Sequence, residues 1–302
     1  MADTSARILT RRALARTEER VRTRALAKRR ISGVVQYGVL VTLLMLMFVP
    51  LLLMLSMSLR RTTLIYANFW GLPIPPYFRN YAITLLDLWM PLVRTIWVYL
   101  MSTSTKLVTA ALAAYAFARL HLWGREVLFY LFVLLVMMIP GVITLSPSYV
   151  LMTRLGLKGS LWGLAISYFS GQAFPVFLLT TFFQAQPAEM FEAARVDGAS
   201  EWQSLWSIAM PVARPILVTI AIMNFMGVYD DLIWPSLMLK NTNKTMMLAL
   251  MNYNPRVSEQ INRPDLGPMT AGYVFGCIPP LILFIVGMRY YVAGLTSGAI
   301  KG

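Results

Sequence analysis

The sequence is poor in the residues that most enzymes and metal proteins use. Its 302 residues include one cysteine, Cys277, and one histidine, His121. A single cysteine excludes a disulfide within the chain and a cluster of cysteine metal ligands. A single histidine leaves no cluster of His, Asp and Glu for a membrane enzyme. We therefore expect no catalytic and no metal-binding residues in this chain.

Acidic residues are also scarce, with 13 Asp and Glu against 27 Lys and Arg, for a formal net charge of +14. In a soluble protein this excess of positive charge would suggest a nucleic-acid partner. Here half of it lies in residues 1–31, which hold ten Lys and Arg and three acids. Such a run is typical of a cytoplasmic tail near anionic lipid, so we expect no nucleic acid among the partners.

Apolar residues are abundant, at 58% hydrophobic against 13% charged, with a mean hydropathy of +0.62. These values are typical of integral membrane proteins. Six stretches are long enough to cross a bilayer: 34–58, 92–118, 127–153, 161–185, 213–236 and 268–292. Backbone polar groups cannot stay unpaired in lipid, so the sequence predicts an all-α integral membrane protein with six transmembrane helices. The first stretch is too long for a signal-peptide core and is expected to remain as a span.

The distribution of positive charge predicts the orientation. An even number of spans places both termini on one side, and the basic tail favours the cytoplasm for that side. The assignment depends on the tail, because without it the outer segments hold more Lys and Arg than the inner ones. Prolines such as Pro140, Pro147 and Pro175 predict bends in the spans. These are either ordinary kinks or bends that shape a cavity and flex during gating.

One polar segment, residues 186–212, lies between the fourth and fifth stretches, and the orientation places it in the cytoplasm. Pro187 suits the first turn of a helix, and Gly198 can end that helix in a left-handed conformation. Ser200 and Gln203 then form a capping box for a second helix. The polar segment is therefore predicted to form a helix–turn–helix. It is either an amphipathic connector at the interface or a surface for a soluble partner.

The spacing of residues in the polar segment resembles a known signature. The pattern is Glu192-Ala193-Ala194, three residues, Gly198, nine residues, then Ile208-x-Met210-Pro211. It resembles the signature loop of ABC importer permeases, in which leucine usually stands at the position of Met210. The stretch Tyr229–Pro235 and the last ten residues, Ala293–Gly302, are similar to carbohydrate-uptake permeases of the maltose type. The resemblance covers about residues 34–302.

This resemblance implies an ABC type I importer permease fold over residues 32–302, with both termini cytoplasmic in the inner membrane of a prokaryote. The polar segment would be the loop that couples to ATPase subunits. The coupling residues would be Glu192, Ala193, Ala194, Asp197, Gly198, Ile208, Met210 and Pro211. The expected partners are a second homologous permease, two ATPase subunits, an extracytoplasmic solute-binding protein, the lipid bilayer and a sugar, namely a di- or oligosaccharide. The chain has no Gly-x-x-x-x-Gly-Lys-Ser/Thr loop, so we expect it to bind no cofactor itself, with ATP and Mg on the ATPase subunits.

The substrate path is harder to read from the sequence. Its candidates are Asn224, Tyr229, Asp230, Asp231 and Trp234, with Tyr168 and Phe169 as further aromatics. Charged groups inside a membrane usually mark functional sites, but we expect Lys106 to extend toward the interface as a snorkelling lysine. An ion-coupled secondary transporter is the alternative from another class, although it would need broken helices around buried acids. An importer of a polyol or a glycerol-phosphate-like compound is the alternative within the family.

Overall fold

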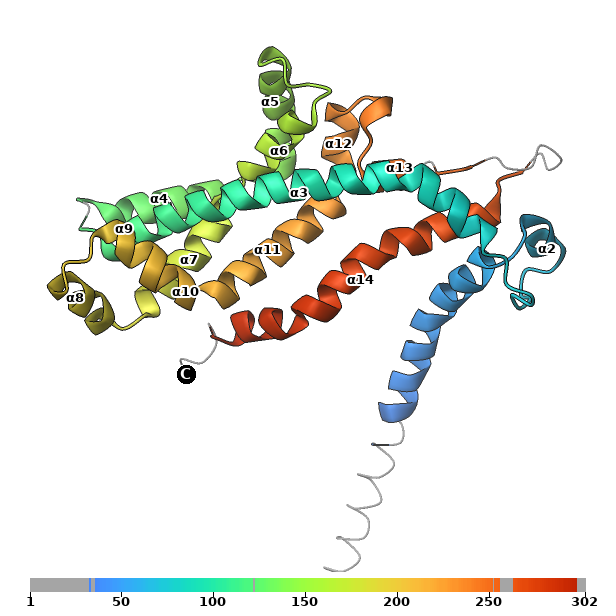
Figure 1. Ribbon diagram of the computed structural model, residues 1–302, viewed down its shortest axis with the longest axis horizontal. Helices are drawn as coiled ribbons and strands as arrows, with labels where there is room; N and C mark the ends of the chain where they lie inside the picture. The colour runs from blue at the N-terminus through green and yellow to red at the C-terminus, as the bar shows by residue number, and fades with distance from the viewer. Residues whose placement is uncertain (1–32, 34–35, 122, 252, 256–262, 298–302) are drawn as a thin grey trace, which may run out of the picture. The chain divides into compact units, whose positions relative to one another are not determined.

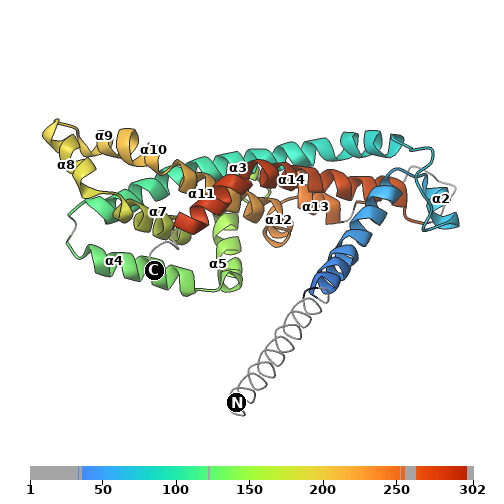
Figure 2. The same cartoon turned by 90° about the horizontal axis from the view of Figure 1, so that it is seen from below.

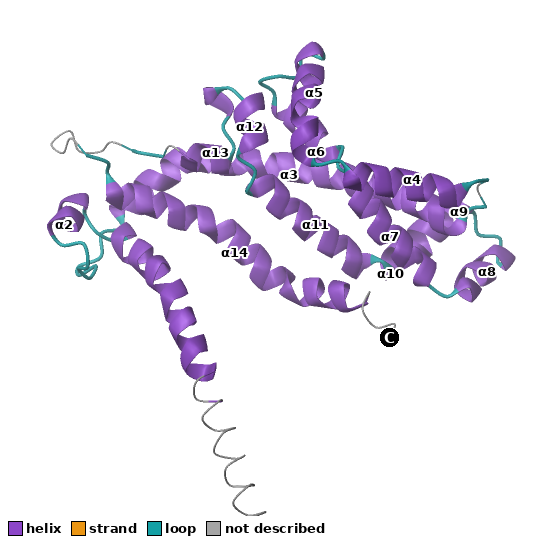
Figure 3. Ribbon diagram, turned by 180° about the vertical axis from the view of Figure 1, so that it is seen from behind, coloured by secondary structure: helices purple, strands orange, loops and turns teal. Residues whose placement is uncertain are grey.

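The computed structural model describes residue 33 and residues 36–121, 123–251, 253–255 and 263–297. Every regular element in these ranges is a helix, as the sequence predicts (Figures 1 and 3). The chain divides into two compact units, Met1–Ser56 and Met57–Gly302. The predicted basic tail, residues 1–31, lies outside the described residues, so its role stays a prediction.

The first unit contains most of the first apolar helix, Gln36–Ser58, whose 23 residues include a window of mean hydropathy 2.7. This length corresponds to about 35 Å, enough for a hydrocarbon core of about 30 Å. Apolar residues lie on all sides of the helix, which is the composition of a membrane span. The helix matches the predicted stretch 34–58.

The second unit is built from helices of very different lengths. In chain order they are α2 (Thr62–Ala67), α3 (Arg79–Arg119), α4 (Arg125–Met138), α5 (Gly141–Arg154), α6 (Leu161–Phe169), α7 (Ala173–Ala185), α8 (Ala188–Val196), α9 (Glu201–Gln203), the π-helix η1 (Ser204–Ala209), α10 (Met210–Val212), α11 (Arg214–Tyr229), α12 (Ile233–Met238), the 3-10 helix η2 (Asn241–Asn243), α13 (Met246–Met251) and α14 (Leu266–Ser297). Within this unit, α2 and α8 lie at opposite ends of α3 (Figures 1 and 2).

The helix α3 is longer than the predicted stretch 92–118, because Pro91 lies inside it without ending it. A proline removes one backbone hydrogen bond from a helix, and packing decides whether the helix continues. α3 packs against α6, α7, α11 and α14. Asn80 and Thr84, in its first two turns, are buried. Tertiary contacts therefore extend the helix to Arg79, and the turn-rich segment before it is shorter than predicted.

Three further candidate spans are bent helix pairs. α4 and α5 meet at 93°, α6 and α7 at 44°, and Glu201–Val212 and α11 at 75°. Pro140 stands at the first break with an extended backbone, whereas Pro147 lies inside α5 without breaking it. Together with the first apolar helix, α3 and α14, the described residues contain three to six candidate spans, depending on whether each bent pair counts as one span.

The predicted stretch 213–236 is wrong at its C-terminal end, because α11 ends at Tyr229 and α12 begins only at Ile233. Between the two helices, Asp231 Oδ1 accepts a hydrogen bond from the backbone N–H of Trp234 (3.2 Å). This side-chain acceptor competes with the helical carbonyl and favours a turn. α11 has 16 residues, or about 24 Å, so it reaches the length of a span only together with its neighbours.

A buried core lies where α3, α7, α11 and the polar segment meet. Its largest members are Tyr115, Leu179, Phe183, Phe191, Leu205, Ile216 and Ile220. The polar segment thus contributes Phe191 and Leu205 to the same core as the spans. Because protein interiors are close-packed and deform little, this packing joins the polar segment firmly to the spans.

Candidate functional site

The first half of the polar segment is a short helix with two defined ends. Pro187 stands at the N-cap of α8, one position before the predicted first turn. At the C-terminal end, the N–H of Ala199 donates to Ala194 O (2.9 Å) and the N–H of Gly198 donates to Arg195 O (3.0 Å). This pair of bonds is the Schellman arrangement. Gly198 has a φ of +79°, a left-handed conformation that costs other residues about 1–2 kcal/mol. The predicted glycine stop is confirmed.

The second half begins with the predicted capping box. Ser200 Oγ accepts a hydrogen bond from the N–H of Gln203 (3.3 Å), and Gln203 Oε1 accepts one from the N–H of Ser200 (2.8 Å). The chain then widens into the π-helix η1, which the sequence did not predict. Such π-turns are rare and frequently lie at functional sites. After α10 the chain bends by 75° into α11.

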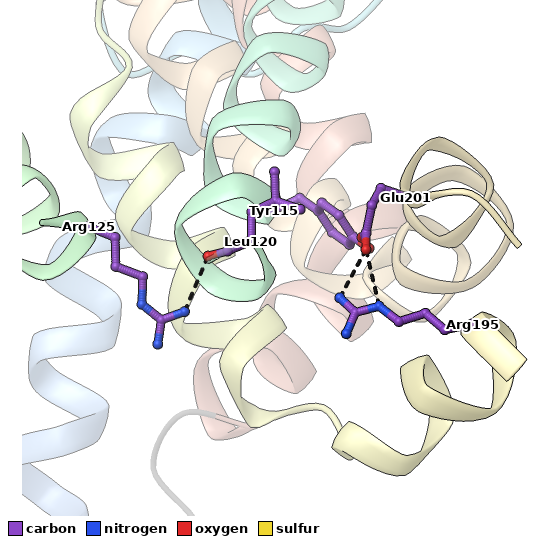
Figure 4. Close-up of polar contacts among 5 residues, drawn as sticks. All are labelled: Tyr115, Leu120, Arg125, Arg195 and Glu201. Atoms are coloured by element: carbon purple, nitrogen blue, oxygen red, sulfur yellow. Dashed lines mark hydrogen bonds and ion pairs between the residues drawn. The ribbon is translucent and has the colours of Figure 1, made fainter. Parts of the chain in front are cut away.

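The end of α3 nearest the polar segment holds both of its halves. Tyr115 OH donates to Glu201 Oε2 (2.8 Å), and two nitrogens of Arg195 donate to Glu201 Oε1 (3.1 and 2.9 Å) (Figure 4). One turn further along α3, the Arg119 guanidinium lies over the ring of Phe191, 4.1 Å from its centroid. Two side chains of α3 therefore fix the positions of α8 and α9. Sequence reasoning missed this contact because Tyr115 and Glu201 are 86 positions apart.

The eight predicted coupling residues divide between two faces. Glu192, Ala193, Asp197, Gly198 and Pro211 are exposed, Ala194 is buried, and Ile208 and Met210 are half-buried against the core. Successive residues of an α-helix point about 100° apart, so Ala193 and Ala194 serve different surfaces. In the structure Ala193 faces outward and Ala194 packs inward.

The exposed face of α8 includes a residue that sequence reasoning missed. Val196 is 88% exposed. It lies three positions after Ala193 and four after Glu192, so these three residues are neighbours on one helical face. The face offers one carboxylate, one small side chain and one apolar side chain. A carboxylate beside a small and an apolar side chain suits contact with another protein.

A second group of polar side chains lies inside the bundle. Lys106 Nζ donates to Asn224 Oδ1 (2.6 Å), and Asn224 Nδ2 donates to Thr103 Oγ1 (2.6 Å). Lys106 is 8% exposed. It does not extend toward the interface as predicted, because the side chain of Asn224 on α11 provides an acceptor for its ammonium group inside the bundle.

The remaining predicted path residues lie at the far end of α11 and mostly bond within the chain. Tyr229 OH donates to Gly276 O (2.6 Å), and Tyr168 OH donates to Asp231 Oδ2 (2.9 Å). Trp234 is buried, whereas Asp230 is exposed. The structure therefore brings Tyr168 and Asp231 together. Of the two predicted path carboxylates, Asp230 is the one with an exposed side chain.

A polar hollow of about 430 Å³ that the sequence did not predict lies between α3 and the segment around α13. Its lining includes Asp87, Arg94, Lys244, Tyr253 and Asn254. Tyr253 OH donates to Asp87 Oδ2 (3.1 Å), and burial raises the pKa of Tyr253, so the hydroxyl remains a donor at neutral pH. Charged and hydroxyl groups of this kind suit a hydroxyl-rich small molecule.

Comparison with known proteins places this architecture in a family. Residues 106–297 match the family described as "Binding-protein-dependent transport system inner membrane component". The trehalose transport system permease protein SugB of Mycobacterium tuberculosis is 32% identical, over 84% of this chain and 92% of the relative. The diacetylchitobiose uptake system permease protein NgcG of Streptomyces coelicolor is 25% identical, over 93% of this chain and 92% of the relative.

A solved structure has the same fold. A chain in the crystal structure of a bacterial ABC transporter involved in the import of the acidic polysaccharide alginate superposes with a TM-score of 0.74. Its sequence is 26% identical, with 87% of this chain and 97% of that chain covered. These matches confirm the resemblance to ABC importer permeases and exclude the ion-coupled alternative. The chain belongs to the binding-protein-dependent inner membrane components, and it is a multi-pass permease subunit of a bacterial ABC importer, a transport component and not an enzyme.

Proposed function

We propose that this chain is one of two permease subunits of an ATP-driven importer of a di- or oligosaccharide. The pairs α4 with α5 and α6 with α7 then count as one span each, and α11 begins the span that follows the polar segment, which gives six spans with both termini in the cytoplasm. The polar segment takes up the motion of two ATPase subunits, which bind ATP and Mg. A solute-binding protein on the outer side delivers the sugar. The main support for the coupling role is the structure of α8. One face of this helix is exposed, and the opposite face packs against α3.

The eight coupling residues have two roles in this proposal. Glu192 and Ala193 contact the ATPase subunit, with Val196 beside them, since all three are exposed on α8. Asp197 and Gly198 form the turn, and Pro211 lies on the exposed side of α10. Ala194, Ile208 and Met210 hold the segment against its core. Because the polar segment is packed firmly against its core, a displacement of its exposed face moves the spans and does not deform the segment.

The sugar substrate is supported by the relatives, whose names specify trehalose, diacetylchitobiose and maltose or maltodextrin. Of the predicted path residues, Asp230 is the one we assign to direct contact, because its side chain is exposed. The other predicted residues support the path without direct contact with the sugar, since they are buried or bonded within the chain. They are Asn224, Tyr229, Asp231 and Trp234. The polar hollow beside α3 is a second place where sugar hydroxyls find partners.

The coupling role is tested in proteoliposomes that contain the complete importer, with uptake and ATP hydrolysis measured together. Gly198→Asp is expected to reduce uptake per ATP hydrolysed at least about tenfold, because it strains the turn and adds a charge beside the ATPase contact. Ala193→Trp is expected to act in the same direction by keeping the surfaces apart. Wild-type uptake per ATP in Gly198→Asp would refute the coupling role.

Gly124 provides a matched control. It also has a left-handed backbone, with a φ of +69°, and nothing lies within 4 Å of an added Cβ, as at Gly198. Gly124→Asp therefore adds the same strain and the same charge outside the polar segment. We expect Gly124→Asp to keep uptake per ATP close to the wild-type value.

The substrate class is tested by competition. Uptake of a labelled disaccharide into the same proteoliposomes, with the loaded binding protein present, is measured against unlabelled disaccharides, a polyol and glycerol phosphate. We expect disaccharides to compete and the other two compounds to leave uptake unchanged. Competition by the polyol or by glycerol phosphate alone would favour the alternative substrates within the family.

A further inference from the structure

α3 is the longest helix of the described residues, and it reaches from the polar segment to the opposite side of its unit in a single piece (Figure 1). Its 41 residues correspond to about 62 Å. The covalent routes out of the polar segment are less direct, because α7 meets α6 at a 44° bend, and η1 is followed by a 75° bend before α11 begins. α3 is continuous through Pro91 over its whole length, so it connects the two ends along one helical axis.

The end of α3 near the polar segment has a polar joint. Glu201 is shared between Tyr115 OH on α3 and the guanidinium of Arg195 at the end of α8 (Figure 4). The Tyr115 ring also packs edge-on against Phe183 of α7, with centroids 6.2 Å apart. The hydroxyl and the ring of Tyr115 thus make separate contacts. Removal of the hydroxyl alone breaks the joint and leaves the packing.

The opposite end of α3 is bonded to the segments that would face the solute-binding protein. Asn80 Nδ2 donates to Ser58 O and to Arg60 O, both at 2.8 Å. Thr84 Oγ1 donates to Pro268 O (3.2 Å) at the start of α14. Glycine is required at Gly267, because an added Cβ would lie 2.7 Å from Arg60 O. This end of α3 is therefore bonded both to residues 58–60 and to the start of α14.

From these contacts we propose that α3 is the strut that carries the docking of the solute-binding protein to the polar segment, with Tyr115 and Glu201 as its joint. The proposal rests on the coupling role of the polar segment. Docking shifts the segments bonded to Asn80 and Thr84, α3 moves with them, and Glu201 moves α9 and α8 at the ATPase contact. Linkage is reciprocal for affinities. If docking of the binding protein raises the affinity of the closed state for ATP by some factor, ATP raises the affinity for the binding protein by the same factor.

The test uses Tyr115→Phe and Thr84→Val, each of which removes one hydroxyl and keeps the shape of the side chain. The measured quantity is the ratio of ATP hydrolysis with loaded binding protein to hydrolysis without it, in proteoliposomes of the complete importer. We expect Tyr115→Phe to lower this ratio about fivefold and Thr84→Val to lower it in the same direction. Tyr130→Phe, at an exposed tyrosine of α4, is the control and keeps the ratio.

The double variant distinguishes a strut from two local defects. The two positions are about 46 Å apart along α3, and changes at such a distance normally act independently. If α3 carries the signal, the second substitution adds less than its single effect, because the path is already broken. A ratio unchanged in either single variant, or a double variant whose effect is the product of the two, overturns the strut.

Subunit stoichiometry of the purified complex is measured for every variant, so that loss of assembly is recognised. If Tyr115→Phe does not assemble, Glu201→Leu removes the acceptor of the same joint from α9, and an unchanged ratio in that variant overturns the proposal. Failure of the strut is distinguishable from failure of the coupling role. Gly198→Asp alone tests the polar segment, and it still uncouples transport if the signal reaches the segment by another route.

Discussion

At the scale of single residues, the buried pair of Lys106 and Asn224 shows how a charge is kept inside the bundle. Burial of an ammonium group is costly unless acceptors surround it. In the structure the acceptor is an amide oxygen at 2.6 Å, and the amide nitrogen is in turn satisfied by Thr103. The two side chains join α3 to α11. Either residue alone would destabilise the bundle, because its polar group would lose this partner.

This pairing predicts an asymmetric pattern of stability. Asn224→Leu leaves Lys106 without its described acceptor and is expected to lower the free energy of unfolding by about 1–3 kcal/mol. The double variant Lys106→Met with Asn224→Leu replaces both partners by apolar groups and is expected to recover most of this loss. Thermal unfolding of the purified complex measures both, with exposed Lys158→Met as the control. Equal losses in the single and double variants would contradict the pairing.

Residue-scale predictions from the sequence succeeded where the signal was local. Gly198 and the pair of Ser200 and Gln203 were identified because a left-handed stop and a capping box depend on residues within a few positions. The position of Lys106 was wrong, because Asn224 lies 118 positions away and the sequence alone does not show which helices adjoin. The joint between Tyr115 and Glu201 was missed for the same reason.

At the scale of elements, the start of α9 depends on its capping box more than on its length. α9 has three residues before η1 begins, too few to be stable alone. Ser200→Ala removes the acceptor for the N–H of Gln203 and is expected to cost about 1 kcal/mol. We expect faster amide hydrogen exchange at residues 201–204 and a smaller uptake per ATP.

Ser200→Thr is the matched control for the cap, because threonine keeps the hydroxyl acceptor. It should restore protection at residues 201–204 nearly to the wild-type level. Hydrogen exchange followed by mass spectrometry resolves this short stretch. Equal protection in Ser200→Ala and the wild type would mean that the contacts of Glu201 with Tyr115 and Arg195 hold α9 without the cap.

The boundaries of the long elements were harder to predict than the caps. The sequence predicted a stretch that begins at residue 92, but α3 continues through Pro91 back to Arg79, and packing against other helices sustains it. Within the run 213–236, the chain turns after α11 at Asp231, which accepts a hydrogen bond from the N–H of Trp234. In both places a tertiary or side-chain contact decided the outcome, whereas hydropathy reports only which residues avoid water.

At the scale of the whole molecule, the orientation in the membrane decides which end of α3 lies on the cytoplasmic side. The bundle fixes the polar segment relative to the outer ends of the spans. Only one orientation of the chain in the membrane therefore places each of them on the side where it functions. The only strong bias in the sequence is the basic run in residues 1–31. Lys and Arg near the first span act most strongly on orientation.

Neutralisation of that run is therefore expected to disturb insertion without changing the bundle. The test replaces the ten Lys and Arg of residues 1–31 by Gln in a Cys277→Ser background, with a single cysteine at Thr63 or at Ser207, both of which are exposed. With the native tail, a membrane-impermeant maleimide added to intact cells should label Thr63→Cys and leave Ser207→Cys unlabelled. With the neutral tail, a fraction of Ser207→Cys becomes accessible, because the remaining charges favour the opposite orientation. If labelling does not change, contacts among the spans fix the orientation during assembly, and the basic tail has another role.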